Sequence, residues 1–305
     1  MAKGKVPLTV FTPTYNRAHT LRRLYDSLAR QSCFDFEWII IDDGSSDNTE
    51  QLITELSQMN NQFPIIYDRQ PNGGKHRAIN KGVKMANGDW FIILDSDDWL
   101  SDNAVAIIKK RIAEVEHNNK FCSITGLRVT PDLKTIGSEC DYVKLDSDFF
   151  SYRFRRRVKG DRAEVIKTSV MREYPFPEFA KENFLGEAVI WNSMSQNYFT
   201  RFTSDKFYIC EYQQGGLTDT FDRMMDANPL GAMANQMSIT KHKGCPVIYW
   251  LIANHYYWHY RKLALLRKNI IPKSLSPTTS MKICSIASPL ISIVIQIRAF
   301  LRRRK

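Results

Sequence analysis

Strand-like and helix-like segments alternate along the first 130 residues, and this alternation restricts the fold more than composition does. Apolar runs occupy residues 6–11, 37–41, 63–67, 90–94 and 121–129. Between them, apolar residues recur every three or four positions, as on one face of a helix. Because strands that alternate with helices of about 10 to 15 residues form parallel sheets, we expect an α/β fold with a mostly parallel sheet flanked by helices.

The remainder of the 305-residue chain is less regular. A chain of this length has room for one large domain or two small ones. Residues 131–230 mix charged, aromatic and proline residues, and we expect loops and short strands that cover one edge of the sheet within the same domain. Residues 231–305 are basic and aromatic and are expected to form a helical C-terminal extension.

The excess of positive charge comes from this C-terminal part. The net charge is +11, from 43 Lys and Arg against 32 Asp and Glu. Asp226 is the last acidic residue, and 13 Lys and Arg follow it, so residues 1–226 hold 30 basic and 32 acidic residues. A near-neutral body with a basic extension, without a helix-turn-helix, zinc-finger or aromatic RNA-binding signature, predicts no nucleic-acid partner.

The six cysteines are scattered and form no C-x-x-C pair, which argues against a zinc site, a redox dithiol or a disulfide scaffold. The first ten residues lack the apolar stretch of a secretory signal. Both features favour a reducing, cytoplasmic location.

Polar residues gather where three of the expected strands end, at Thr12–Asn16, Asp42–Ser46 and Asp95–Asp98. Parallel sheets bind ligands at the carboxyl ends of their strands. Turn formation explains any one of these loops, but the three together predict a ligand site.

Asp95-Ser96-Asp97 places two carboxylates one residue apart, directly after an apolar run. Carboxylate oxygens suit Mg²⁺ or Mn²⁺, which can also bridge a diphosphate. About one such pair is expected by chance in this composition, and Asp146-Ser147-Asp148 is a second. The second pair lies in an irregular stretch and is interpreted as a solvated loop, so the first is the candidate metal site.

Two further segments have features of a nucleotide site. An acid at a strand end, as in Asp42-Asp43-Gly44-Ser45, can accept a base N–H or a ribose hydroxyl, although an Asp-Gly turn is the structural alternative. Asn72-Gly73-Gly74-Lys75 offers backbone N–H groups at a helix start, followed by the cations Lys75 and Arg77, which favours phosphate. A glycine-rich turn before an exposed basic helix explains this segment equally well.

Together these segments resemble family 2 glycosyltransferases of the GT-A fold, a Rossmann-like architecture. The matching residues are Thr12 to Arg17, Ile41 to Asp47, Asn72-Gly73-Gly74 with Ala78, Asn80 and Gly82, and Leu94 to Asp98. Their order and spacing cover about residues 6–130. The resemblance implies an inverting transferase that takes a sugar from a nucleotide-diphosphate donor and uses Mn²⁺ or Mg²⁺.

The resemblance also implies roles for single residues. Thr14 and Asp43 would lie against the nucleoside, with Asp42 nearby. Asp95 would face the ribose or the metal, and Asp97 would bind the metal that bridges the diphosphate. The full set implied for nucleotide-sugar binding is Pro13, Thr14, Tyr15, Arg17, Asp42, Asp43, Asn72, Gly73, Lys75, Asp95 and Ser96, with Asp97 and Asp95 as metal ligands.

The catalytic base is expected later in the chain, because inversion needs a carboxylate that takes a proton from the acceptor hydroxyl. Residues 184–191 resemble the family segment in which an acid begins a helix beneath the acceptor site, which makes Glu187 the candidate. Many relatives have Glu-Asp where this chain has Glu187-Ala188. Glu178 and Glu182 are competitors, and a helix-start acid favoured by the helix dipole is the structural alternative.

The end of the chain has the pattern of a membrane-surface helix. Residues 283–297 are uncharged, with apolar residues at helical spacing opposite a serine-rich stripe. Fifteen helical residues span about 22 Å, which is short of the ~30 Å hydrocarbon core. We expect residues 245–305, with their aromatics and the final Arg302-Arg303-Arg304-Lys305, to bind an anionic membrane surface. Packing on the body and a true membrane span are the alternatives.

We therefore predict a metal-dependent inverting glycosyltransferase, peripheral on the cytoplasmic face of the cell membrane. Residues 1–130 would bind the donor, a UDP-sugar, and residues 131–230 would bind the acceptor, a hydroxyl of a lipid-linked or cell-surface glycan. One alternative is a sugar-nucleotide pyrophosphorylase, which would need a glycine-rich basic loop where this chain has Thr12 to Arg17. Another is a non-catalytic membrane or nucleic-acid adaptor that uses the basic tail. The oligomeric state is open.

Overall fold

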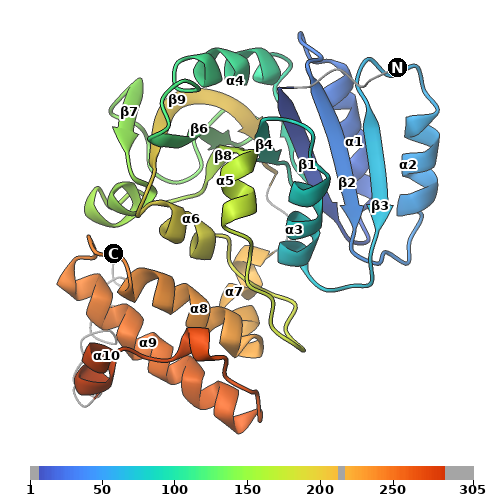
Figure 1. Ribbon diagram of the computed structural model, residues 1–305. Coiled ribbons are helices and arrows are strands. Elements are labelled where there is room, and N and C mark those ends of the chain that lie inside the picture. The colour runs from blue at the N-terminus through green and yellow to red at the C-terminus, as the bar shows by residue number, and fades with distance from the viewer. Residues whose placement is uncertain (1–6, 212–216, 286–305) are drawn as a thin grey trace.

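The computed structural model describes residues 7–211 and 217–285, in which a sheet is enclosed by helices and a group of C-terminal helices packs below it (Figure 1). The strands are β1 (Leu8–Thr14), β2 (Phe36–Asp42), β3 (Ile65–Arg69), β4 (Trp90–Ile93), β5 (Trp99–Leu100), β6 (Phe121–Val129), β7 (Lys144–Ser147), β8 (Arg162–Lys167) and β9 (Phe199–Ile209). The helices are α1 (Ala18–Ala29), α2 (Thr49–Ser57), α3 (Lys75–Met85), α4 (Ala104–Ala113), α5 (Thr168–Glu173), α6 (Ala188–Met194), α7 (Leu217–Ala227), α8 (Pro229–Thr240), α9 (Val247–Leu266) and α10 (Thr279–Cys284), with a π-helical turn η1 (Ser151–Arg155) and a 3₁₀ turn η2 (Lys273–Leu275).

In the part of the chain that the structure describes, the strands form one sheet in the order β3-β2-β1-β4-β8-β6-β9-β5, with β7 paired to β9. The strands β1 to β4 run parallel to one another. Every residue of β1 and β2 is buried, which explains their mostly apolar character. The buried Glu37 carboxylate accepts a hydrogen bond from the Thr9 hydroxyl at 2.7 Å. The predicted α/β fold is therefore confirmed.

The second half of the sheet differs from the prediction. β8 lies between β4 and β6 and runs antiparallel to both, so the predicted fifth strand is not a neighbour of the fourth. Residues 131–230 supply this central strand and the long β9, rather than only loops and short strands over an edge. β8 escapes a search for apolar runs because it contains Arg162, which is buried but donates hydrogen bonds to the Tyr152 hydroxyl and the Ser138 carbonyl.

The second D-x-D pair is also placed differently from the prediction of a solvated loop. Asp146 belongs to β7, which pairs antiparallel with β9. Its carboxylate accepts hydrogen bonds from Arg201 at 2.8 and 2.7 Å. This pair therefore contributes an ion pair to an edge strand.

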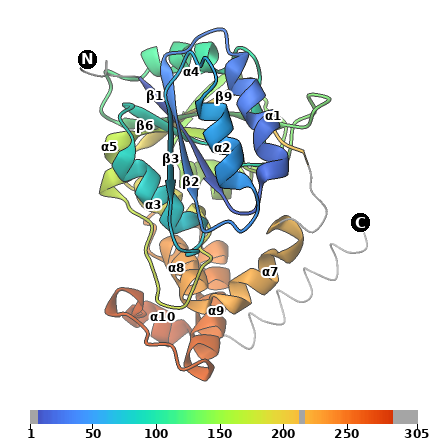
Figure 2. The same cartoon turned by 90° about the vertical axis from the view of Figure 1, so that its right-hand side faces the viewer.

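Two hydrophobic cores fill the two faces of the sheet. Side chains alternate between faces along a strand, so Phe11 and Ile39 face α3, α5 and α6, whereas Val10 and Ile40 face α1, α2 and α4. Figure 2 shows α1 and α2 on one side of the strands and α3 and α5 on the other.

The C-terminal helices share the first of these cores. Leu230 of α8 and Tyr257 of α9 belong to the same buried cluster as Trp191 of α6. The Tyr257 hydroxyl donates to the Leu275 carbonyl at 2.6 Å. Some of the aromatics expected at a membrane interface are therefore packed inside the protein.

The predicted interfacial helix at residues 283–297 lies mostly outside the described residues, as does the Arg302–Lys305 cluster. Among the helices of residues 7–211 and 217–285, none combines the length and the apolar character that crossing a bilayer requires.

Candidate active site

The carboxyl ends of β1, β2 and β4 lie side by side, because β1 pairs with β2 on one side and with β4 on the other. Thr14 and Asp42 are register partners at the ends of their strands. Asn16 has a φ of 53°, and its side-chain oxygen accepts a hydrogen bond from the Ser46 N–H at 2.8 Å. This contact ties the loops after β1 and β2 together at the edge where Asp95 follows β4.

Lys75 joins the acidic motif to the candidate base. Its ammonium nitrogen lies 2.5 Å from Asp95 Oδ1 and 2.7 Å from Glu187 Oε1. The three residues come from the start of α3, the end of β4 and the residue before α6. The structure thus brings together three predicted site residues that are far apart in the sequence.

Lys75 and Asp95 hold each other ionised. Burial acts to lower the pKa of Lys75, but the carboxylates of Asp95 and Glu187 outweigh it and raise that pKa. Burial acts to raise the pKa of Asp95, but Lys75 and then Arg128 outweigh it and lower that pKa. The Lys75–Asp95 contact is therefore an ion pair at neutral pH.

Arg128 of β6 and Asp98 belong to the site although sequence reasoning gave them no role. The Arg128 guanidinium lies 3.5 Å from Asp95 and 3.9 Å from Asp98, and covers the Tyr208 ring at 4.4 Å. Burial, and then the negative charge of Asp95, raises the pKa of Asp98 to about 7. A buried charge needs a partner of opposite charge. An arginine within the apolar run of β6 was therefore the feature of the sequence that could have indicated a nearby acid.

Asp43 points toward the glycine turn before α3. Its carboxylate accepts hydrogen bonds from the N–H of Gly73 at 2.9 Å and the N–H of Gly74 at 2.7 Å. The Gln70 side chain donates a third at 2.7 Å. In this structure, the Gly73 N–H that was predicted to face phosphate is therefore used by Asp43.

Thr14 offers an unused hydroxyl at the end of β1. Its oxygen is buried and has no hydrogen-bond partner among the described residues, so a bound group that pairs with it would remove an energetic cost. Asp42, in contrast, already accepts hydrogen bonds from the Tyr67 hydroxyl and the Ser45 N–H. Of the other predicted binding residues, Pro13 and Ser96 are buried, Arg17 is half-buried, and Tyr15 and Asn72 are exposed.

Asp97 is the acid of the motif that remains available to a metal ion. Its side chain is 26% exposed, and Arg17 lies 3.9 Å away. Both oxygens of Asp95 face cations, Lys75 on one side and Arg128 on the other. Residues 7–211 and 217–285 contain no group of three or more His, Cys, Asp or Glu arranged to hold a metal. The residues present fit an ion bound by one or two carboxylates and completed by phosphate and water oxygens, as is usual for Mg²⁺.

The two competitors for the role of base have other contacts. Glu182 is buried and accepts hydrogen bonds from the N–H groups of Leu230 and Gly231, both at 2.8 Å, so that it caps α8. Glu178 is about half exposed and lies 3.4 Å from Arg77. Of these acids, Glu187 is the one whose carboxylate shares Lys75 with Asp95.

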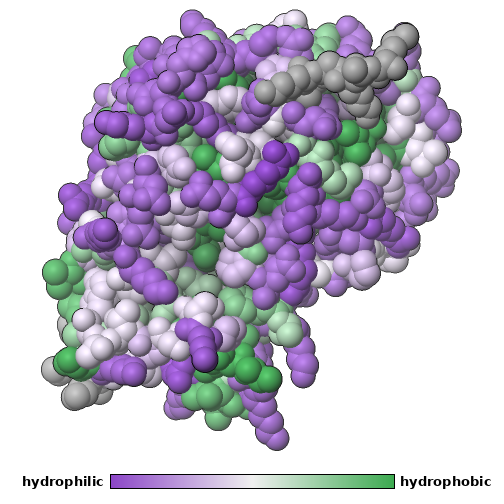
Figure 3. All heavy atoms as spheres, in the orientation of Figure 1, coloured by the Kyte–Doolittle hydropathy of each residue, from purple (hydrophilic) through white to green (hydrophobic). Residues whose placement is uncertain are grey.

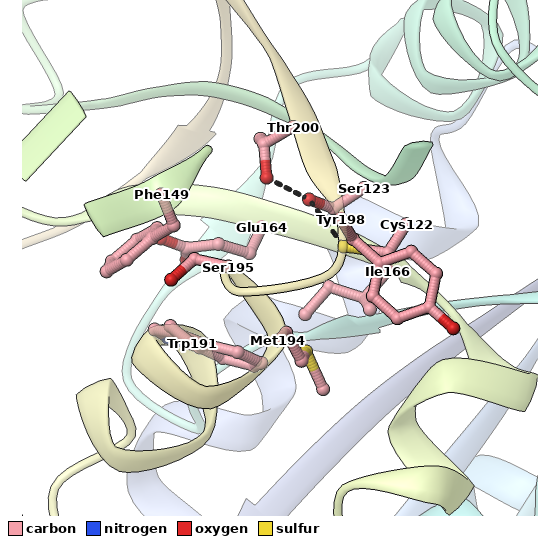
Figure 4. Close-up of a pocket in the computed structure, with 10 residues that line it drawn as sticks. All are labelled: Cys122, Ser123, Phe149, Glu164, Ile166, Trp191, Met194, Ser195, Tyr198 and Thr200. Atoms are coloured by element: carbon pink, nitrogen blue, oxygen red, sulfur yellow. Dashed lines mark hydrogen bonds between the residues drawn. The ribbon is translucent and has the colours of Figure 1, made fainter. Parts of the chain in front are cut away.

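A small pocket lies between α6 and the sheet, as Figure 4 shows. Its volume of about 10 Å³ is enough for one water molecule. Burial raises the pKa of Glu164, which lines it, to about 8, against the opposing charge of Arg128. At pH 7 this carboxyl is mostly neutral and can donate a hydrogen bond. The lining residues are Cys122, Ser123, Phe149, Glu164, Ile166, Trp191, Met194, Ser195, Tyr198 and Thr200.

Comparison with known proteins bears on this site. Residues 9–172, more than half of the chain, match the family model described as glycosyl transferase family 2. Hyaluronan synthase of Pasteurella multocida is 34% identical over 159 residues, which cover 50% of this chain and 16% of that protein. Glycosyltransferase GlyA of Streptococcus pneumoniae is 33% identical over 109 residues, 36% of this chain and 15% of that protein. The match therefore spans about a sixth of the length of these relatives.

Two solved structures share the fold. S. aureus TarS 1–349 in complex with UDP-GlcNAc has a TM-score of 0.60 at 17% identity, over 92% of this chain and 79% of that chain. Mannosyltransferase PcManGT from Pyrobaculum calidifontis, in complex with GDP-Man and Mn²⁺, has a TM-score of 0.57 at 12% identity, over 98% and 84%. These likenesses show that the chain has the GT-A architecture.

Proposed function

Because this chain belongs to glycosyl transferase family 2, we propose that it is a metal-dependent inverting enzyme that moves a sugar from a nucleotide-diphosphate donor to an acceptor hydroxyl. The single observation that supports this proposal most is the contact of Lys75 with both Asp95 and Glu187. This contact holds a carboxylate that could act as a base next to Asp95. Asp95 lies at the edge formed by the carboxyl ends of β1, β2 and β4, here called the donor edge.

A UDP-sugar is the proposed donor. The TarS structure contains UDP-GlcNAc, and the PcManGT structure contains GDP-Man with Mn²⁺, so the shared architecture accommodates nucleotide-sugars. In this chain, the unpaired Thr14 hydroxyl and the exposed Tyr15 would meet the nucleoside. Arg17 and Lys75 would supply positive charge for the diphosphate.

Glu187 would act as the base. Its carboxylate takes the proton of the acceptor hydroxyl while the hydroxyl oxygen forms a bond to the anomeric carbon. The bond from that carbon to the diphosphate oxygen breaks, and the nucleoside diphosphate leaves with the electron pair. Attack on the face opposite the leaving group inverts the configuration of the carbon.

Asp97, with Asp95 beside it, would hold Mn²⁺ or Mg²⁺. When bound, the ion would offset the negative charge that builds on the departing diphosphate. Arg128 and Lys75 already balance the charge of Asp95, so Asp97 is the ligand that we expect the metal to depend on.

A panel of nucleotide-sugars tests the proposed function. We expect one UDP-sugar to raise the melting temperature and to be cleaved to UDP, slowly with water and faster with a suitable glycan acceptor. GDP- and TDP-sugars should give little product, and removal of divalent metal with EDTA should stop the reaction. Failure of every nucleotide-sugar to bind or react, with either Mg²⁺ or Mn²⁺ present, would contradict the proposal.

We also propose that the acceptor is a lipid-linked or cell-surface glycan and that residues 245–305 hold the protein on the cytoplasmic face of the membrane. Apolar residues gather over the C-terminal helices (Figure 3). At the end of α9, Leu265, Leu266 and Ile270 are 57%, 68% and 90% exposed, next to Arg267 and Lys268. Exposed apolar side chains beside cations suit an anionic lipid surface.

Vesicle flotation checks this surface. The full chain should float with vesicles that contain phosphatidylserine and less with neutral vesicles. Changing Leu265, Leu266 and Ile270 together to Gln should lower the bound fraction by at least about fivefold, because the loss of even one buried apolar side chain, at roughly 1.5–3 kcal/mol, weakens binding more than tenfold. Leu133→Gln, at an exposed leucine on the body, is the matched control. Equal flotation of the triple variant and the unaltered chain would refute the role of these residues.

A further inference from the structure

The segment that leads to the candidate base has no helix or strand of its own. Residues 174–187, here called the base segment, connect α5 to α6. Backbone polar groups without a ladder partner must be satisfied by side chains or water. The side chains that bind this backbone therefore determine where Glu187 lies.

Side chains from α3 and from the residue that precedes α8 supply those contacts. From the α8 side, the Asn228 side-chain oxygen accepts hydrogen bonds from the N–H groups of Asn183 and Phe184. From α3, Asn80 both donates to and accepts from the backbone of Phe176, at 2.9 Å each. The base segment is thus held from two sides.

Arg77, in the first turn of α3, binds the backbone of the base segment at two further positions. Its guanidinium donates to the carbonyl of Phe179 at 2.7 Å and to the carbonyl of Glu182 at 2.8 Å. It also donates to the carbonyl of Gly73, in the turn that precedes its own helix. A planar guanidinium can bind several acceptors in one fixed geometry, which an ammonium cannot do.

The turn at Gly73 and Gly74 connects these contacts to the donor edge. Asp43, which follows β2, accepts the N–H groups of both glycines. Gly74 has a φ of 94°, and a Cβ at this position would lie 1.8 Å from the Asn183 carbonyl oxygen. The turn therefore touches the base segment directly, and Arg77 fastens the two together.

We propose that Arg77 is a positioning residue, which fixes the base segment and hence Glu187 relative to the donor edge. The inference rests on the proposed function of Glu187. In the sequence, Arg77 beside a glycine-rich turn suggests a phosphate ligand. In the structure, its donors are directed at backbone carbonyls and its Nε lies 3.4 Å from Glu178, so it is committed within the protein.

The test compares Arg77→Gln and Arg77→Lys with the unaltered enzyme. Because misplacement of a reacting group by about 1 Å can cost on the order of 100-fold, kcat should fall by about 10- to 100-fold, and less for Lys than for Gln. The donor KM and the Kd of UDP should change by less than about twofold. Lys81→Gln is the matched control, since Lys81 on the same helix donates to the Arg69 carbonyl and pairs with Asp68. It should keep its kcat.

A second comparison separates positioning from a general structural role. If Arg77 acts through Glu187, Arg77→Lys should slow the reaction little further in a Glu187→Gln background, because the two effects are then not additive. Full activity of Arg77→Gln, or a raised donor KM with unchanged kcat, would overturn the inference, the second result by assigning Arg77 to phosphate.

Hydrogen exchange keeps the inference testable even if no donor is found. Amides of residues 174–187 should exchange about tenfold faster in Arg77→Gln than in the unaltered chain or in Lys81→Gln, while the β1 and β2 amides keep their rates. Unchanged exchange in the base segment would refute the proposed contact role. Absence of activity in the unaltered enzyme would instead count against the proposed function.

Discussion

Replacement of Glu187 by Gln is expected to lower the kcat of sugar transfer by about 10³-fold, within the 10²- to 10⁴-fold range of general base catalysis. The amide keeps the size of the side chain and can still accept a hydrogen bond from Lys75, but it cannot take the proton of the acceptor. Donor binding should persist, because Asp95 and Arg128 remain in place. Steady-state transfer rates and calorimetric titration with UDP measure the two quantities separately.

Two other acids provide the controls for Glu187. Glu173→Gln changes an exposed acid at the end of α5 and should leave kcat within about twofold. Glu178→Gln tests the competitor in the base segment. A collapse of activity in Glu178→Gln, together with substantial activity in Glu187→Gln, would reverse the assignment of the base.

Replacement of Asp97 by Asn should lower kcat/KM by about 10²- to 10³-fold, because the metal's charge stabilisation is worth several kcal/mol. The variant should also need a higher concentration of Mn²⁺ or Mg²⁺ for half-maximal rate, since a neutral amide is a poorer ligand for a hard cation. A metal titration from an EDTA-treated enzyme measures both effects.

The second D-x-D pair supplies a matched control for Asp97. Asp146→Asn removes an acid from the same three-residue pattern, but its carboxylate pairs with Arg201 on the β7–β9 edge. Its metal titration should coincide with that of the unaltered enzyme. If Asp97→Asn shows the same metal dependence as Asp146→Asn, Asp97 is not a ligand.

The first half of the fold could be predicted because β1, β2 and β4 are buried on both faces. Most residues of β1 and β2 are apolar, and clusters of polar residues mark where each strand ends. In a parallel sheet those ends share one edge, which is why Thr14, Asp42 and Asp95 could be grouped from the sequence alone.

The second half could not be predicted in the same way. β8 alternates charged and apolar residues, and its charges are satisfied by partners such as Tyr152 that are close only in the folded protein. The direction of the Asp43 carboxylate was equally hidden, because it depends on the turn at Gly73 and Gly74 coming within hydrogen-bond distance. Local pattern indicates where a strand ends, whereas the partners of its polar residues depend on tertiary contacts.

The link between Lys75 and Glu187 is the clearest example. Sequence reasoning assigned Lys75 to the donor and Glu187 to the acceptor, each from its own neighbourhood. The single ammonium group that serves both carboxylates follows from the placement of α3 beside the start of α6. It could be seen only in the assembled fold.

The cap that Glu182 places on α8 couples the base segment to the C-terminal helices, so that recombination could not exchange the two independently in this chain. The acid lies in the segment that leads to the base, while the N–H groups it satisfies belong to Leu230 and Gly231 at the start of the C-terminal helices. Consider a chimera whose C-terminal helices come from another protein and offer no N–H groups at these positions. Its buried Glu182 carboxylate would lose two hydrogen-bond partners, at a cost of about 1–3 kcal/mol or more. Residues 174–187 and α8 should therefore be exchanged as one unit, even though more than 40 residues of sequence separate Glu182 from α8.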